Sequence, residues 1–140
     1  MFVDEKDTKI ISILMKDART PKTKIAKELN ISETAVRKRI ARLEKEGIII
    51  GYKATINYKL AKMVASLTGL DVDPDKLLDV IKILKKIPEI KSIYLTTGDH
   101  VLMIEVVGKS VDELAKIHDN IAKLEGVKRI CPSIILDVLK

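Results

Sequence analysis

Basic and polar side chains gather in one stretch of the sequence, at spacings that would suit contact with a polyanion. Four of the six residues from Arg37 to Arg42 are basic. Val36, Ile40 and Leu43 recur at intervals of four and three, which is the period of one buried helical stripe. Side chains off this stripe could meet phosphates and base edges. The candidate DNA contacts are Ser32, Glu33, Thr34, Arg37, Lys38, Arg42, Lys45 and Lys53.

These candidates fall into groups along the expected helix. Residues near its amino end would face base edges or the groove, and the strongest of them are Thr34, Arg37 and Lys38. Cations further along the chain would face phosphates, and these are Arg42, Lys45 and Lys53. A DNA reader built in this way needs a scaffold that turns the basic side of the helix outward.

Three helices are needed to position this segment. Asp4 can cap the first, and Thr20–Pro21 is a start signal for the second, because Pro loses no hydrogen bond at the first helical position. Ser32 can cap the third helix, which Gly47 would end. The tight turn at Leu29–Ser32 predicts a helix-turn-helix, whose second helix lies in the DNA major groove.

The flanks of the third helix carry two further expectations. Arg39 borders the buried stripe, so we expect a structural role in which its guanidinium pairs with Glu44 or Glu46. The apolar run that starts at Ile48 predicts a short strand as far as Ala54. This strand would serve as a wing that brings Lys53 near the DNA backbone.

The excess positive charge lies entirely in the first half of the chain. The 140 residues include 26 Lys and Arg and 20 Asp and Glu. Residues 1–62 carry 15 basic and 8 acidic residues, or +7, whereas residues 63–140 carry 11 and 12, or −1. This asymmetry favours a nucleic-acid-binding module joined to a neutral module. A three-helix bundle with a merely solvated basic surface is the alternative.

The composition argues against several other classes of protein. Apolar residues make up 46% of the chain, which is enough for a folded core. Cys131 is the only cysteine, so we expect neither an internal disulfide nor a multi-cysteine metal site. No apolar run approaches the ~20 residues of a membrane span, and the charged start at Asp4–Asp7 argues against a secretory signal. We therefore expect a cytoplasmic protein with no membrane partner.

The second half of the chain follows the order β-α-β-β-α-β. Asp73–Pro74 and the capping box Ser110–Glu113 would begin its two helices. Residues 86–93 resemble residues 123–130, and in both places a helix runs into a strand. This order predicts an α+β fold with a ferredoxin-like domain, in which both helices cover one face of an antiparallel sheet. The expected strands are 63–70, 90–96, 101–107 and 127–138.

Both faces of this expected sheet carry apolar residues. Ile134–Leu136, for example, places apolar side chains at successive positions of a strand, which point to opposite faces. The face without helices would therefore be apolar as well. This pattern predicts pairing of the sheet with a second copy of the chain.

Four segments of the sequence resemble one known family. They are Asp4–Leu14, Ala26–Ser32, Arg37–Ile49 and Thr97–Asp99. The most specific part is the string Arg-Ile-x-x-Leu-Glu-x-x-Gly-x-Ile within the third segment, combined with Thr-Gly-Asp downstream. These segments resemble the Lrp/AsnC family of transcription regulators, also called feast/famine regulatory proteins, and the resemblance covers essentially the whole chain.

The resemblance implies a domain plan and a set of partners. A winged-helix-like helix-turn-helix domain would occupy residues 1–50, a connecting strand or hinge residues 51–62, and a dimerisation and effector-sensing domain residues 63–140. The partners would be double-stranded DNA and the chain itself, as a homodimer and as larger assemblies of dimers. In the family, amino acids or related small molecules bind at contacts between dimers and alter assembly.

Carried over residue by residue, the resemblance implies an effector site at a hairpin turn and on the last strand. The implied site residues are Thr97, Gly98, Asp99, His100 and Ser133. The family commonly continues Gly-Asp-aromatic-Asp, whereas Val101 stands here in place of the second carboxylate. An amino-acid effector needs a carboxylate for its ammonium group. The alternatives are therefore an amino-acid-like effector, a different ligand, or a plain hairpin turn.

Two readings outside gene regulation stay open. Some relatives of the family are haem-pathway decarboxylases, so a tetrapyrrole-pathway enzyme is one alternative. The two histidines, His100 and His118, lie far apart in the chain, and the sequence has no metal, phosphate-loop or nucleophile motif. We expect no catalysis, cofactor or metal, with His118 at the rim of its helix and Cys131 a packed thiol. The other alternative is a ligand-sensing assembly module without DNA binding.

Overall fold

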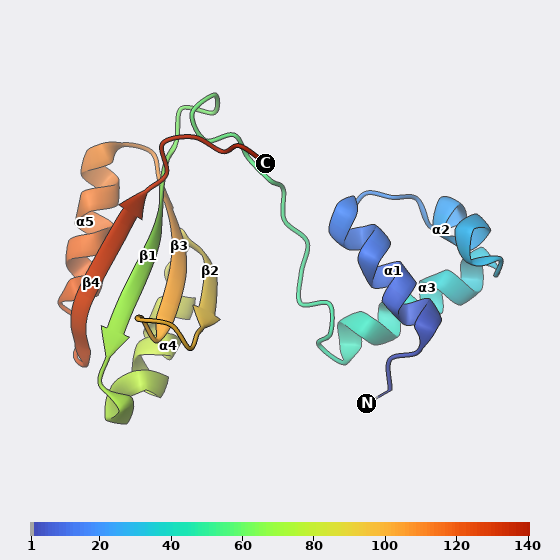
Figure 1. Ribbon diagram of the computed structural model, residues 1–140, viewed down its shortest axis with the longest axis horizontal. Coiled ribbons are helices and arrows are strands. Elements are labelled where there is room, and N and C mark those ends of the chain that lie inside the picture. The colour runs from blue at the N-terminus through green and yellow to red at the C-terminus, as the bar shows by residue number, and fades with distance from the viewer. Residues whose placement is uncertain (1) are drawn as a thin grey trace. The chain divides into compact units, whose positions relative to one another are not determined.

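The computed structural model describes residues 2–140 and divides into two compact units (Figure 1). The first unit, Met1–Thr55, contains three helices, and the second, Ile56–Lys140, contains a four-stranded sheet with two α-helices. The division falls inside the 51–62 segment that the sequence predicts as a connection. Every helix in residues 2–140 is too short or too polar to span a bilayer.

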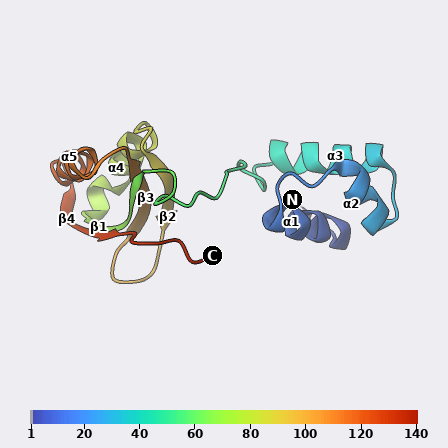
Figure 2. The ribbon, with the colours of Figure 1, turned by 90° about the horizontal axis from the view of Figure 1, so that it is seen from above.

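The first unit packs α1 (Glu5–Lys16), α2 (Lys22–Leu29) and α3 (Glu33–Lys45) around one apolar core. Figure 2 shows α1 and α3 on two sides of this unit, with α2 at the end of both. The tight turn between α2 and α3 confirms the predicted helix-turn-helix. The buried side chains of this core are Ile10, Ile25, Ala26, Val36, Ile40 and Leu43.

The start signals of α1 and α3 are confirmed. The Asp4 carboxylate accepts a hydrogen bond from the N–H of Asp7 at 2.8 Å, and the Asp7 carboxylate accepts one from the N–H of Asp4 at 3.1 Å. The Ser32 hydroxyl accepts from the N–H of Ala35 at 3.0 Å. Asn30 adopts the left-handed conformation, with φ 54° and ψ 48°, and this allows the tight turn before α3.

The start signal predicted for α2 is wrong in one respect. α2 begins at Lys22 with Pro21 as its cap residue, and no side chain caps it. The Thr20 hydroxyl instead donates a hydrogen bond to the carbonyl of Asp17 at 2.7 Å, which closes the turn after α1. Pro21 still guides the chain into the helix through its fixed φ of −61°.

The strand predicted for residues 48–54 is absent, as is any strand in the connecting segment. The N–H groups of Ile48 and Ile49 donate to the carbonyl of Leu43, at 2.9 and 3.1 Å, and so they close the end of α3. Gly47, at φ 73°, allows the backbone to reverse there. The apolar run therefore covers the helical core. This unit has no neighbouring strand with which the run could form backbone hydrogen bonds.

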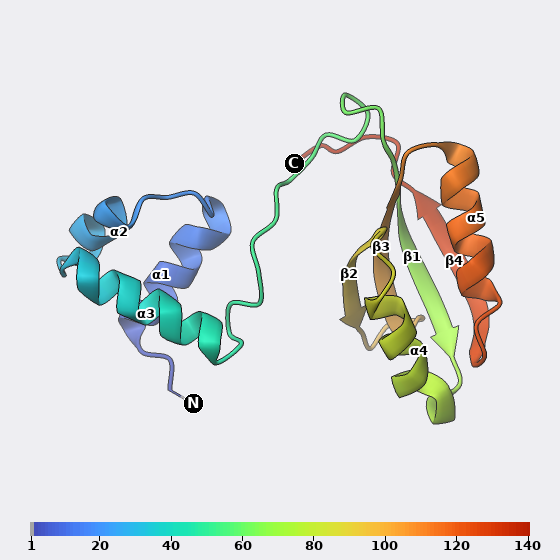
Figure 3. The ribbon, with the colours of Figure 1, turned by 180° about the vertical axis from the view of Figure 1, so that it is seen from behind.

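The second unit is an antiparallel sheet in the order β2-β3-β1-β4. Figure 3 shows both α-helices on one face of this sheet, which confirms the ferredoxin-like prediction. A 3₁₀ turn at Pro74–Lys76 precedes the first of these helices. The elements in chain order are β1 (Val64–Val72), α4 (Leu77–Lys85), β2 (Ile90–Leu95), β3 (Leu102–Gly108), α5 (Val111–Ala122) and β4 (Val127–Ile134).

The core of the second unit lies between the sheet and the two helices. β3 alternates buried residues with half-buried ones, so that every second side chain points toward the helices. The buried members of this core are Leu70, Val72, Val80, Leu84, Leu102, Ile104, Val106, Leu114 and Ile121. The two helices of this unit leave the other face of its sheet uncovered (Figure 1).

The last strand is shorter than predicted. β4 ends at Ile134, whereas the sequence predicts a strand as far as residue 138. Its partner β1 begins at Val64, so few residues of β1 remain to pair with a longer β4. The last bond to this strand is donated by the N–H of Ile135 to the carbonyl of Ala65 at 2.9 Å.

The helix starts predicted in the second unit are only half right. Asp73 makes no side-chain cap, because the 3₁₀ turn at Pro74–Lys76 separates it from α4. The Ser110 hydroxyl does accept from the N–H of Glu113, at 3.1 Å. The Glu113 carboxylate, however, accepts from the N–H of Lys109 at 3.2 Å rather than from Ser110.

His118 is buried, not at the rim of its helix as the sequence predicts. Its Nε2 lies 2.8 Å from the hydroxyl of Ser66 and 3.4 Å from that of Thr68. Both hydroxyls come from the helix-facing side of β1, and they are 2.8 Å from each other. Burial lowers the pKa of His118 from its usual 6.5, so the ring stays neutral at neutral pH and takes part in the core.

Candidate nucleic-acid interface and hairpin turn

The exposed face of α3 lies opposite its buried stripe. Thr34, Lys38, Ala41 and Lys45 follow one another at intervals of four, three and four, and all are exposed. We call these four residues the outer stripe. Neither of its lysines has an ion-pair or hydrogen-bond partner within residues 2–140. The outer stripe therefore offers two free cations on a polar helix face.

Three further predicted contacts lie at the amino end of α3. Arg37 pairs with Glu33 at 2.6 Å, and both side chains are largely exposed. An exposed pair of this kind is worth about 0–1 kcal/mol, so a DNA phosphate could replace the glutamate at little cost. The Ser32 hydroxyl already accepts from the backbone of the helix, which gives this residue a capping role.

Arg39 does not pair with Glu44 or Glu46, so that prediction is wrong. Its Nη1 donates to both carboxylate oxygens of Asp4, at 2.8 and 2.7 Å, and to Asp7 at 3.0 Å. These partners lie more than 30 residues away in the chain. Spacing along one helix reveals only neighbours three or four residues apart, and so it could not reveal them.

Arg42 also reaches the amino end of α1. Its guanidinium binds the Asp7 carboxylate, and it donates to Glu46 at 3.0 Å and to the carbonyl of Phe2 at 3.1 Å. The Asp7 side chain is only 1% exposed. Arg42 therefore lies on the flank of α3 that faces α1, beside the outer stripe rather than on it.

The charges in this region alter the acidity of their partners. Hydrogen bonds from Arg39 and from the backbone of Asp7 lower the pKa of Asp4 from 3.8 to about 2. In turn, hydrogen bonding to Asp4 raises the pKa of Arg39, and hydrogen bonding to Asp7 raises that of Arg42. Asp4, Arg39 and Arg42 are therefore ionised at neutral pH.

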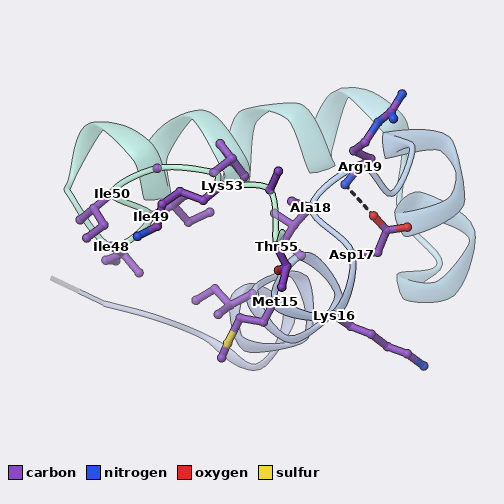
Figure 4. Close-up of a pocket in the computed structure, with 15 residues that line it drawn as sticks. Met15, Lys16, Asp17, Ala18, Arg19, Ile48, Ile49, Ile50, Lys53 and Thr55 are labelled. Atoms are coloured by element: carbon purple, nitrogen blue, oxygen red, sulfur yellow. Dashed lines mark hydrogen bonds between the residues drawn. The ribbon is translucent and has the colours of Figure 1, made fainter. Parts of the chain in front are cut away.

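Lys53 lies apart from α3, in the segment that follows it. It lines a hollow of about 550 Å³ between the end of α1 and residues 48–55 (Figure 4). The wall combines apolar side chains such as Ile49 with the cationic Arg19. The backbone N–H of Arg19 donates to the carboxylate of Asp17 at 2.9 Å. Lys53 is thus the one predicted DNA contact that belongs neither to α3 nor to its cap.

The turn between β2 and β3 carries most of the predicted effector residues. The N–H of Thr96 donates to the carbonyl of Val101 at 2.9 Å, and the Thr96 hydroxyl donates to the carbonyl of His100 at 2.5 Å. These bonds close the hairpin. Its tip, Thr97–Asp99, is exposed.

His100 folds back from this turn onto β1. Its Nδ1 lies 2.9 Å from a carboxylate oxygen of Asp71. The ring rests against Gly69, where a Cβ would overlap it. A glycine inside an apolar strand is a sequence signal for such a close approach, whereas nothing in the sequence singles out Asp71.

Ser133 shares a face of the sheet with this ring. The register pairs Gly69 with Cys131 and Leu67 with Ser133, so all four residues lie on the face away from the helices. Ser133 stands two positions further along β4 than the residue opposite Gly69. The structure therefore places Ser133 and His100 on one face. Within residues 2–140, no group of three or more His, Cys, Asp or Glu is arranged to hold a metal.

Comparisons with known proteins cover both units. A model of winged helix-turn-helix DNA-binding domains matches residues 3–50, and a model of the Lrp/AsnC ligand binding domain matches residues 66–140. The HTH-type transcriptional regulator LrpA of Pyrococcus horikoshii is 48% identical over 99% of this chain and 100% of its own length. The HTH-type transcriptional regulator LysM of Sulfurisphaera tokodaii is 41% identical over 97% of this chain and 96% of its own.

Solved structures share the fold. E. coli AsnC has a TM-score of 0.69 and 24% identity over 100% of this chain and 96% of its own. A transcriptional regulator from Neisseria meningitidis, solved as a complex with L-Met, has a TM-score of 0.69 and 20% identity over 99% of this chain and 93% of its own. At these identities the likeness concerns the fold alone.

The contact between Gly69 and His100 gives a first prediction. Gly69→Ala should lower the free energy of unfolding by about 1–3 kcal/mol, because the new Cβ displaces the ring from Asp71. In a His100→Ala background the same change should cost little. Urea unfolding of the four proteins measures both effects. Gly98→Ala is the control, since a Cβ there meets nothing within 4 Å. Equal costs in the two backgrounds would contradict this contact.

Proposed function

The chain belongs to the Lrp/AsnC family of DNA-binding transcription regulators, and from this premise we propose how it reads DNA, pairs with itself and senses a ligand. The observation that carries the proposal is the outer stripe of α3, whose lysines have no partner within residues 2–140. The named relatives are regulators, which supports a role without catalysis. We propose that this role is exercised in the cytoplasm.

For DNA reading, α3 enters the major groove with the outer stripe toward the bases. Thr34 and Lys38 lie nearest its amino end and make base or groove contacts, together with Arg37 once it leaves Glu33. Lys45 and Lys53 contact phosphates on either side. Arg42 is held by carboxylates, and its role is argued separately below.

For pairing, two copies of the chain meet through the sheet face without helices. Leu67, on that face of β1, is 49% exposed, and Tyr94 is exposed on the same face of β2, opposite Met103 of β3. Apolar residues on an open sheet face favour burial against a like face. A twofold pair of this kind would present two α3 helices to successive major grooves, about 34 Å apart.

For ligand sensing, the site is the exposed tip of the β2–β3 turn. Asp99 supplies a carboxylate for the ammonium group of an amino-acid-like ligand. The carboxylate that Val101 lacks has a substitute nearby, because Asp71 reaches the same turn through His100. The match to a ligand binding domain model and the L-Met complex of the Neisseria regulator support this ligand class.

The DNA proposal predicts the effect of removing one free cation. Lys38→Ala should weaken binding to a duplex that the wild-type protein selects from a random library. It should also reduce the slope of log affinity against log salt by about 0.9, the share of one phosphate contact, if Lys38 touches the backbone. Loss on the selected duplex but not on a scrambled one assigns Lys38 to base reading instead. Mobility shift across a salt series measures both, and Lys86→Ala in the second unit is the control. Unchanged binding to both duplexes would remove Lys38 from the interface.

The pairing proposal predicts where a charge disrupts assembly. Leu67→Lys should raise the dimer dissociation constant at least about tenfold, because it buries an unpaired ammonium group between the two sheets. Light scattering after size exclusion measures the mass. The matched control is Leu78→Lys on α4, where the leucine is 76% exposed on the helix side of the domain. If only the Leu78 variant dissociates, the dimer forms through the helices.

The ligand proposal predicts a loss of response without a loss of pairing. A panel of L-amino acids should include one that changes the scattering mass of the wild-type protein. Asp99→Ala should keep the dimer but lose this change, because the ammonium group loses its partner. Asp75→Ala, also an exposed aspartate of the second unit, should respond normally. Survival of the response in Asp99→Ala places the ligand elsewhere, and no response in the wild type contradicts an amino-acid ligand.

A further inference from the structure

A partly buried ionic cluster joins the amino end of α1 to the flank of α3. Asp4 and Asp7 contribute two carboxylates from the start of α1, and Arg39 and Arg42 contribute two guanidinium groups from successive turns of α3. Glu46, just after α3, adds a third carboxylate at 3.0 Å from Arg42. We call these five residues the α1–α3 clamp. Its formal charge is −1, so it offers no net attraction to a phosphate.

Asp7 is the centre of this clamp. Its side chain is 1% exposed, and its carboxylate meets both arginines as well as the N–H of Asp4. A carboxylate removed from water in this way needs partners of opposite charge in fixed geometry. The two arginines are therefore held in place by a group that the protein cannot leave unpaired.

This arrangement fixes the rotation of α3 about its own axis. Arg39 and Arg42 are three residues apart on one flank of the helix, and both are drawn toward α1. That flank contacts α1, and the apolar stripe packs in the core. The side of the helix that carries Lys38 and Ala41 therefore faces outward. The clamp thus decides which side chains of α3 a duplex meets.

We propose that Asp7 is a positioning residue for DNA reading: it holds Arg39 and Arg42 so that the outer stripe faces the groove, and it keeps Arg42 away from the phosphates. This inference rests on the proposed DNA-reading face of α3. It changes the assignment of Arg42, which the sequence predicts as a phosphate contact. Asp4 stays ionised at neutral pH, since the hydrogen bond from Arg39 lowers its pKa to about 2.

The test compares Asp7→Asn with Asp7→Glu on two duplexes. One is selected by the wild-type protein from a random library, and the other is a scrambled sequence of the same composition. Asp7→Asn should bind the selected duplex at least about tenfold more weakly and should not lose affinity for the scrambled one. The slope of its log affinity against log salt should become steeper by about 0.9, because the released Arg42 becomes a phosphate contact. Asp7→Glu should recover most of the selectivity, since Glu is also suited to this capping position and keeps the charge.

A merely structural role gives a different result. If Asp7 only stabilised the fold, the folded fraction would fall, and binding to both duplexes would fall by the same factor with an unchanged salt slope. Circular dichroism and urea unfolding, run on the same samples, report the folded fraction. An equal loss on both duplexes overturns the proposal.

Arg42→Ala keeps the proposal testable if Asp7→Asn does not fold. This variant should leave the salt slope unchanged, because the clamp already withholds Arg42 from phosphates. A slope reduced by about 0.9 would show a direct phosphate contact and overturn the proposal. Glu5→Gln is the control, since Glu5 is exposed and pairs with Lys9 outside the clamp, and this variant should bind as the wild type does. If the wild-type protein selects no duplex, the proposed DNA reading fails rather than the role of Asp7.

Discussion

A carboxylate that cannot reach water constrains the first unit of this protein. Asp7 is buried at the start of α1, and its charge is stable there only because two arginines of α3 surround it. The same carboxylate accepts the N–H of Asp4 and so completes the cap of α1. One side chain therefore caps the start of α1, joins α1 to α3 and orients α3. The apolar core holds the helices together. Apolar contacts are not directional, so the ion pairs of Asp7 further define how α3 is rotated against α1.

A comparable division of labour occurs along β1 in the second unit. Its helix-facing side carries Ser66 and Thr68, which bind the buried ring of His118. Its opposite side carries Gly69 and Asp71, which receive the ring of His100 from the hairpin turn. Because side chains alternate along a strand, one strand supports the inner core and the outer face at once. A ligand that moves the turn would therefore act on the sheet face that we propose for pairing. The single residue that connects the two is His100.

Local patterns predicted most of the fold, and long-range pairing explains what they missed. The helical period of α3, the caps at Asp4 and Ser32, and the βαββαβ order are all encoded within a few neighbouring residues. The partners of Arg39 and the burial of His118 depend on chain segments more than 30 residues away, so no local spacing reveals them. The strand predicted at 48–54 fails for a related reason: its apolar residues suit a strand, but a strand forms only where another strand accepts its hydrogen bonds. For the candidate sites, the residues of the turn were found through the family resemblance, whereas Asp71 was not.

The clamp also shows why a count of basic residues overstates attraction to DNA. The first half of the chain carries a net charge of +7, and α3 holds much of its basic density. Yet the charges of Arg39 and Arg42 are neutralised by carboxylates of the clamp. The salt dependence of binding counts the phosphates that are neutralised, not the cations in the sequence. A helix that keeps part of its charge in internal pairs gains less electrostatic binding energy from a duplex of arbitrary sequence. In our proposal, its free lysines and the shape of the outer stripe still distinguish one sequence from another. We therefore propose that the selectivity of this protein depends on the charge that α3 holds in internal pairs as well as on the charge that it leaves free.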